Sequence, residues 1–594
     1  MKNIVIILCG LLFILPLTSC KKEFLNKPPL GYLTESQLVT KEGVNGLLIG
    51  AYSLLDQGGS VGGGYMIRRY LYGETASDNA HIGTEAGAGS VMLESYTYEA
   101  NSMSHVNARW RFIYSAVQRA NEVIRILAKV PEGAMTDAEI LQATAEATFL
   151  RGYWHLEAAL LWRKVPYIDE TINYENGNYY VSNDVSIWPF IENDLKFASD
   201  NLTATKPNVG RINSWGAKAF LAKTYMFQHK FNEAKTLLED IITKGVTASG
   251  QKYKLMDRYI DNFIPSKKNN SESVFAAQMS VNDGGLGNNG TLSNGFGYAG
   301  PYGGPYPTFG FHQPSFTLVN SYKTDPVTGL PLLTTFNDND IANDQGIASS
   351  APFTPHTGPL DSRLDWTISR RGIPLLDWGV NPGMAWVRQQ SIQGPFLVLK
   401  GANPKSEPGA REQLSTAVND VLIRFADVLL WAAEAEVEVG SLAKAEEYTN
   451  MVRARAANPD GWVYKYIDDS DPSKGYSATP AANYKVGLYT GQFEANGKDF
   501  ARESVRFERK IELGMEGHRF FDLQRYDNGS GYMANTINAY ILHETTIPNS
   551  TTFMNYLKGA KFTKGKNELF PIPQEQIDLS IVDGVPTLTQ NPGY

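Results

Sequence analysis

The carboxylates that stand beside tryptophans are the first residues in this sequence whose types could do chemistry. Asp361, Asp365 and Asp377 lie close in sequence to Trp366 and Trp378. Two carboxyl groups are what a glycoside hydrolase uses, but they must be held at a set separation, which sequence spacing does not show. Aspartate is also common in turns. We therefore expect no catalytic residue here, and a glycan-cleaving enzyme stays open as an alternative.

A second concentration of ionisable groups surrounds a predicted helix near the C-terminus. Phe507, Ile511, Gly514 and His518 recur at helical spacing, so they share one face, and Gly514 would let another backbone come close. The charged residues that we single out around this face are Arg506, Glu512, Glu516, Arg519, Asp522 and Arg525.

The signs of these charges indicate a structural role. Arg519 and Asp522 stand three residues apart, as do Asp522 and Arg525, and opposite charges at this spacing pair on a helix. Charges paired so evenly do not suit a site that must keep one ionisable group poised. We therefore predict that Arg506 to Arg525 is a joint between helices, and that the ligand lies elsewhere.

Composition and motifs exclude several other classes of function. The eight histidines form no His-Glu-x-x-His or His/Cys cluster, so we expect no transition-metal site. No EF-hand-like run marks a calcium site, and calcium bound by loop Asp and Asn oxygens stays open. A glycine-rich loop followed by Lys-Ser/Thr is missing too, and we expect no cofactor. The formal net charge of −8, without a basic run, argues against nucleic acid as a partner.

The N-terminus has the pattern of a targeting segment. Lys2 precedes a short apolar run, and Leu17-Thr18-Ser19-Cys20 resembles the lipobox at which bacterial lipoproteins are cut and acylated. An ordinary signal peptide would share the apolar run. Because Cys9 lies inside the signal, Cys20 would be the one cysteine of the mature chain, where it can form no internal disulfide. We predict that Cys20 carries a lipid anchor.

Helical periodicity dominates the rest of the chain. Apolar residues recur at three- and four-residue steps through 107–129 and 138–163. Segment 215–244 fills most positions of a tetratricopeptide repeat, and 421–456 is a looser second unit. We predict a mainly α fold of tetratricopeptide-like helical pairs. Its expected divisions are a signal peptide at 1–20, a tether at 21–33, and a single domain at 34–594 whose scaffold spans about 107–245 and 420–456.

A loop-rich insertion at about 280–415 separates the two parts of this scaffold. It is dense in Gly, Pro, Asn and aromatics, and such long irregular segments are usually functional or disordered. Its aromatic content argues against disorder. Aromatic rings in loops can stack on sugar rings, although each ring could instead pin its own loop. The candidate ligand-binding residues here are Tyr298, Tyr302, Tyr306, Trp366, Trp378 and Trp386.

Several segments, in the same order along the chain, together resemble the SusD/RagB family. They are Cys20 to Pro28, Phe149-Leu150-Arg151-Gly152-Tyr153-Trp154 running on to Val165-Pro166, Asp361 to Gly379, Arg506 to Arg525, Leu569-Phe570-Pro571-Ile572-Pro573, and Gln590-Asn591-Pro592-Gly593-Tyr594. The departures are small: Lys510 replaces an Arg of the family signature, and Tyr526 stands where Trp is common.

The resemblance implies a helical scaffold of tetratricopeptide pairs and a lipoprotein exposed on the outer membrane. It implies a SusC-like TonB-dependent barrel transporter as partner, over which the protein acts as a lid while capturing an oligosaccharide. Part of the ligand surface would be an N-terminal loop near Asp78, Asn79 and His81. Some relatives serve peptide uptake instead, and no catalysis is expected. Peptide capture and a periplasmic helical-repeat scaffold therefore stay open.

Overall fold

The computed structural model describes residues 34–57, 68–83, 91–102, 104–281, 310, 312–407, 416–547 and 557–594. The predicted signal peptide and tether lie outside these ranges, as do Cys20, Tyr298, Tyr302 and Tyr306. Within the described ranges, no helix has the length and apolar character needed to cross a bilayer.

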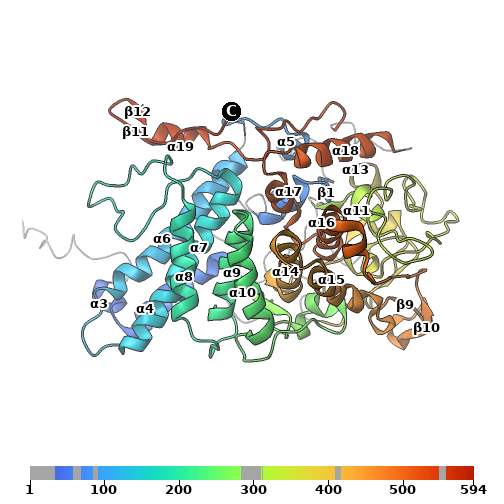
Figure 1. Ribbon diagram of the computed structural model, residues 1–594, viewed down its shortest axis with the longest axis horizontal. Coiled ribbons are helices and arrows are strands. Elements are labelled where there is room, and N and C mark those ends of the chain that lie inside the picture. Colours follow the sequence, from blue (N-terminus) through green and yellow to red (C-terminus); the bar gives the residue numbers. More distant parts are fainter. Residues whose placement is uncertain are drawn as a thin grey trace, which may run out of the picture.

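A row of helices, packed mainly against their neighbours along the chain, forms the scaffold (Figure 1). Helix α8 packs against both α7 and α9, and α10 packs against α14, which joins the two predicted repeat units across the insertion. The mainly α fold of tetratricopeptide-like pairs is confirmed. The helices of the row are α4 (Lys41–Tyr52), α6 (Ser104–Leu127), α7 (Asp137–Trp162), α8 (Trp188–Asn201), α9 (Ser214–Phe227), α10 (Phe231–Lys244), α14 (Phe425–Val439), α15 (Leu442–Ala457) and α16 (Gln492–Glu512).

Side-chain caps fix where several of these helices begin. Thr136 and Glu139 form a capping box at the start of α7, and the Asn213 side chain accepts from the Gly216 amide at the start of α9. Each cap satisfies amides that lack a partner in the first helical turn. The short helix α3 (Glu35–Leu38) begins at Thr34 in the same way.

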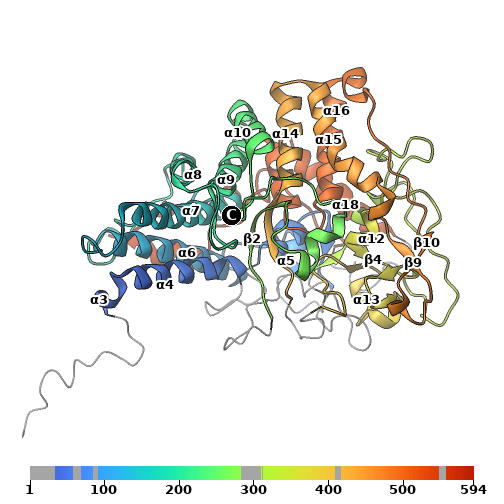
Figure 2. The ribbon, with the colours of Figure 1, turned by 90° about the horizontal axis from the view of Figure 1, so that it is seen from below.

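The insertion is closed at its base by two strands that lie at its ends. Strand β2 (Ser273–Ala277) pairs antiparallel with β8 (Asp420–Arg424). The described insertion residues contain short elements, which are β3 (Gln313–Pro314), α11 (Phe316–Asn320), α12 (Leu364–Thr367), β4 (Ile368–Ser369), β5 (Pro374–Leu375), β6 (Gly379–Val380), α13 (Gln390–Gln393) and β7 (Leu397–Val398). Figure 2 shows these elements gathered beside the helical row.

The C-terminal part runs back along the row, from α18 (Tyr532–Thr546) near the insertion to α19 (Gln574–Leu579), which bonds to α6 (Figure 1). Helix α16 ends at Glu512, and a tight turn leads to α17 (Arg519–Asp527), so Gly514 and His518 lie in the turn and not on the helix as the spacing predicted. The close approach of backbones involves another pair, because a Cβ on Gly73 would overlap the carbonyl of Gly517. The remaining elements are the hairpins β9 (Tyr464–Tyr466) with β10 (Tyr476–Pro480) and β11 (Ile581–Val582) with β12 (Val585–Pro586).

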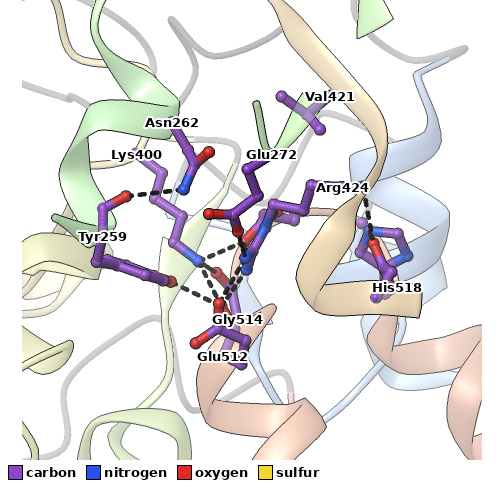
Figure 3. A network of polar contacts seen from close by, with 12 residues as sticks. Tyr259, Asn262, Glu272, Lys400, Val421, Arg424, Glu512, Gly514 and His518 are labelled. Carbon is purple, nitrogen blue, oxygen red and sulfur yellow. Dashed lines mark hydrogen bonds and ion pairs between the residues drawn. The ribbon is translucent and has the colours of Figure 1, made fainter. Parts of the chain in front are cut away.

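A buried ion-pair network joins this turn to the scaffold and the insertion (Figure 3). The Glu512 carboxylate accepts from Arg363 at 2.8 Å, from Arg424 at 2.5 Å, and from Arg455. Burial alone would raise the pKa of Glu512, but the three guanidinium groups outweigh it and hold the pKa well below its ordinary value. The charge is therefore kept inside the protein by partners from three other segments.

The network continues into the turn after α16. Glu516 accepts from Arg424 at 2.9 Å and from the Lys400 ammonium at 2.7 Å. The same ammonium donates to the Gly514 carbonyl at 2.7 Å. Glu272, just before β2, accepts from Arg424 at 2.8 Å. Residues of the insertion, the two base strands and the family signature are thus held by one set of charges.

Replacing Glu512 by Gln should destabilise the fold strongly. The variant keeps the shape of the side chain but leaves Arg363, Arg424 and Arg455 buried without a common counter-charge, which costs about 3–5 kcal/mol of unfolding free energy. The matched control is Lys196→Ala in the Lys196–Asp200 pair on α8, whose side chains are 62% and 56% exposed. Unfolding in guanidinium chloride measures this loss. Equal midpoints of unfolding for the two variants would contradict the central role of Glu512.

Candidate ligand-binding site

Residues of the family signature, Arg506 to Arg525, hold the predicted N-terminal binding loop in place. Asp78 is buried, and its carboxylate accepts from Lys510 at 2.8 Å and from Arg519 at 2.7 Å. Burial alone would raise the pKa of Asp78, but these two cations hold it well below its ordinary value. Arg519 therefore pairs with Asp78 and not with Asp522 as the helical spacing predicted, whereas the Asp522–Arg525 pair is present at 2.9 Å.

Asn79 and His81 also face the interior. The side-chain nitrogen of Asn79 donates to the Glu74 carboxylate at 2.8 Å, and the same carboxylate accepts from the backbone amide of Gly517. His81 lies in β1 (Ala80–His81), opposite Gln313. Burial lowers the pKa of His81 to about 4, so its ring is neutral at physiological pH. As ligand contacts these side chains stay predictions, while their contacts in the structure hold the loop in place.

The candidate tryptophans differ in how far they are buried. The Trp366 indole donates to the Gly461 carbonyl at 2.7 Å, and the side chain is nearly inaccessible. The Trp378 indole donates to the Asn403 carbonyl at 2.9 Å and is half-buried. Trp386 is buried. All three rings are thus buried or half-buried, and a role in ligand binding stays a prediction for each of them.

The described ends of two stretches of chain meet at this loop. The Gly83 amide donates to the Gly310 carbonyl at 2.8 Å, and the Ser315 amide donates to the Asn79 carbonyl at 2.9 Å. Residues that precede 84–90 and follow 282–309 thus lie side by side. The described residues that follow the predicted ligand-binding tyrosines Tyr298, Tyr302 and Tyr306 therefore begin next to the Asp78–His81 loop.

A cavity of about 570 Å³ opens beside Asp78, between α16, α18 and residues 333–337. Aromatic and charged side chains share its wall, which is the combination that binds sugars by stacking and hydrogen bonding. The aromatic residues are Phe336, Phe500, Phe507, Tyr532 and Tyr540, and the charged ones are Asp78, Asp499, Glu503, Arg506, Lys510 and Arg519.

Arg506 is a signature residue that lines this cavity. Its guanidinium lies 4.8 Å from the Tyr532 ring centre and 4.4 Å from that of Tyr526. It pairs with Glu503 at 3.0 Å, and its Nε atom is buried without a hydrogen-bond partner among the described residues. The signature therefore reaches the wall of a candidate site.

A cavity of about 600 Å³ between α4, α7 and residues 206–211 has a different lining. Aliphatic side chains such as Val44, Leu48 and Ile49 share its wall with charged ones such as Glu146 and Arg211, and among the described residues no aromatic ring lines it. A sugar would find no flat face to stack on there. The cavity beside Asp78 is therefore the better candidate.

Sequence reasoning missed the aromatic wall of this cavity. Phe336 lies in a segment of the insertion without periodicity, and Tyr532 is the first residue of α18. The sequence offered one signal for Tyr532, which is that it follows shortly after the signature. Distance along the chain does not show which rings line a cavity. Lys400 and Arg424 of the ion-pair network were missed for the same reason.

The carboxylates considered for catalysis have structural partners. Asp361 accepts from Arg363 at 2.7 Å, and Asp365 accepts from Arg370 at 2.7 Å. Asp377 accepts from two backbone amides, those of residues 405 and 406. In the described part of the chain, no group of three His, Cys, Asp or Glu side chains is placed to hold a metal ion.

Comparison with known families identifies the chain. The model of the SusD family matches residues 271–594, and a model described as "Starch-binding associating with outer membrane" matches residues 23–226. This chain belongs to the SusD family. A SusD-like protein of Bacteroides ovatus is 30% identical over 189 residues, 31% of this chain and 34% of that protein. A SusD-like protein of Formosa agariphila is 22% identical over 524 residues, 86% and 87% of the two chains.

Solved structures share the SusD fold with this chain. A SusD homolog from Bacteroides thetaiotaomicron has a TM-score of 0.66 at 21% identity, covering 95% of this chain and 99% of the other. Surface glycan-binding protein A from the same species, in complex with laminarihexaose, has a TM-score of 0.61 at 18% identity, covering 93% and 99%.

His543 carries a charge at the edge of the candidate site of this SusD-family chain. Its ring lies 3.0 Å from Asp340 and 3.5 Å from Glu544, and it contacts the hydroxyl of Thr317, which lines the cavity. Burial alone would lower the pKa of His543. The hydrogen bonds with Asp340 and Glu544 outweigh burial and raise the pKa to about 9.

The raised pKa of His543 predicts a pH-dependent stability. Its contribution is fully present below the ordinary pKa of 6.5 and is lost as the pH rises through about 9. The wild type should therefore lose unfolding free energy relative to His543→Asn between pH 7 and pH 10, as measured by urea denaturation at each pH. A difference between the two proteins that stays constant over this range would show that His543 is not charged in the native state.

Proposed function

We propose that this chain is a non-enzymatic lipoprotein of the outer membrane that captures oligosaccharides and delivers them to a SusC-like TonB-dependent transporter, acting as its lid. The observation that carries this proposal is membership of the SusD family, to which the description "Starch-binding associating with outer membrane" adds both a ligand class and a location. Peptide capture by the same fold is the rival that the experiments below separate.

The titles of solved relatives support a glycan as ligand. One of them is in complex with laminarihexaose, and another with a TM-score of 0.54 is described as a laminarin binding SusD-like protein. The cavity beside Asp78 supports the same ligand class, because aromatic faces stack on sugar C–H groups while Asn337, Asp499 and Arg506 can bond hydroxyls.

Delivery to a transporter needs a protein held close to the membrane. The predicted anchor at Cys20 and the tether at 21–33 would supply that position, because acyl chains bind a bilayer firmly when more than one is present. The cavity walls come from α16, whose C-terminal end the ion-pair network holds, and from α18, whose Tyr532 hydroxyl donates to Glu503 of α16 at 3.0 Å. Co-purification of a barrel transporter with the tagged protein would support the partnership.

Truncating the aromatic wall should weaken glycan binding. Phe336→Ala and Tyr532→Ala each remove a ring from the cavity, and the loss of stacking should lower affinity about tenfold. Calorimetry against panels of oligosaccharides and peptides measures this effect. The control is Leu542→Ala on the exposed side of α18, where the side chain is 65% exposed.

The outcomes of this experiment separate the rival functions. Binding of peptides but not oligosaccharides would replace glycan capture by peptide capture. Sustained release of reducing sugar by the purified protein would show that it is an enzyme. Unchanged oligosaccharide affinity in both cavity variants would place the glycan outside this cavity.

Replacing Cys20 by Ala should release the protein from membranes, because it removes the residue that would be acylated. Fractionation of cells followed by detergent phase separation measures the shift from membrane to soluble fraction. The matched control is Cys9→Ala, which lies inside the apolar signal and should leave the protein membrane-bound. A Cys20→Ala protein that stayed with the membrane would contradict the lipid anchor.

A further inference from the structure

The loop that joins α7 to α8 exposes three tyrosines side by side. Tyr174 is 84% exposed, Tyr179 40% and Tyr180 41%. The rings of Tyr174 and Tyr179 lie 4.8 Å apart between centres, and those of Tyr179 and Tyr180 lie 4.5 Å apart. Soluble proteins seldom gather large apolar side chains on an open surface without a binding role.

Asparagine side chains hold this loop in one shape. The Asn173 amide donates to Asn178 Oδ1 at 3.0 Å, and the Asn176 amide donates to Asn173 Oδ1 at 2.8 Å. The side-chain nitrogens of Asn176 and Asn178 both donate to the Thr171 carbonyl. The polar groups of the loop thus bond inward, while the rings are left to face solvent.

The start of the loop is fastened to the helical row. Arg125 of α6 donates to the Glu170 carbonyl at 2.7 Å and to the Ile172 carbonyl at 2.9 Å. Asn121 of the same helix donates to the Ile168 carbonyl at 2.9 Å. A surface held in this way loses little conformational entropy when it binds a ligand.

The charge of the loop restricts what it can bind. The loop begins with Arg163 and Lys164, and its remaining residues, 165–187, contain Asp169, Glu170, Glu175 and Asp184 but no Lys or Arg. Arg151 pairs with Glu170 at 2.5 Å, so the other three carboxylates give the tyrosine-bearing part a negative charge. This charge disfavours an anionic polysaccharide or a phosphate-bearing partner. Flat rings with phenolic hydroxyls suit an uncharged sugar chain.

We propose that Tyr174, Tyr179 and Tyr180 form a second contact surface for neutral polysaccharide, separate from the cavity beside Asp78. The inference rests on the proposed function, since it assumes a glycan ligand, and it adds where a long chain is held. In Figure 1 the α7–α8 loop lies at the left end of the helical row, whereas α16 and α18 lie to the right of its middle. A long chain could engage both surfaces, whereas a short oligosaccharide would occupy one.

Two linked contacts raise the apparent affinity for a long ligand over that for a short one. The triple variant Tyr174→Ala, Tyr179→Ala, Tyr180→Ala should therefore bind polysaccharide about tenfold or more weakly than wild type, while binding of the matching hexasaccharide changes by less than about twofold. The probes are laminarin, soluble starch and galactomannan with their hexasaccharides, measured by calorimetry on full-length protein in detergent.

Two further variants identify the cause of any loss. Changing the three tyrosines to Phe keeps the rings, so polysaccharide affinity should stay within about threefold of wild type. Tyr476→Ala removes a 45% exposed tyrosine of β10 and should have no effect. These two results together would show that the aromatic rings of this loop carry the binding, and that removing any exposed tyrosine is not enough to lose it.

The failures are distinguishable. If wild type binds polysaccharide and the triple Ala variant binds it equally well, the second surface is overturned and the proposed function stands. The same holds if that variant instead loses a co-purifying protein, because the loop is then a protein contact. If wild type binds none of the glycans, long or short, the proposed function and the second surface fall together.

Discussion

The buried charge of Glu512 is the constraint on which the rest of the structure depends. A carboxylate inside a protein is stable only when cations and hydrogen bonds replace its hydration. Here Arg363 comes from the insertion, Arg424 from the end of β8 and Arg455 from α15. These segments must be in place together, or a charge is left unpaired. The network therefore couples the insertion to the helical row.

The same segment of chain also places the candidate site. Within one short stretch, Glu512 faces the network, while Lys510 points to the other side of α16 and binds Asp78. Arg519, just beyond the turn, binds the same carboxylate. The predicted joint, Arg506 to Arg525, and the predicted binding loop around Asp78 are therefore held together by ion pairs. Arg506 extends it to the cavity wall, so the signature that was predicted to be structural also lines the candidate site.

The helical row is long, and the two candidate binding surfaces lie on different parts of it. The cavity beside Asp78 is concave and lies where α16 and α18 meet the insertion. The tyrosines of the α7–α8 loop are exposed on a loop between two helices of the row. A row of packed helices bends little, so the spacing between such surfaces is set by the fold.

The sequence by itself determined what depends on neighbours along the chain. Periodicity placed α6, α7, α9 and α10 within a few residues, because an amphipathic helix repeats its apolar face every 3.6 residues. The family motifs likewise identified the fold from their order. Only the tertiary structure decided that Arg519 pairs with Asp78, 441 residues away, and that Phe336 and Tyr532 share one cavity. Such contacts form between segments that packing brings together, and the spacing of residues along the chain does not predict them.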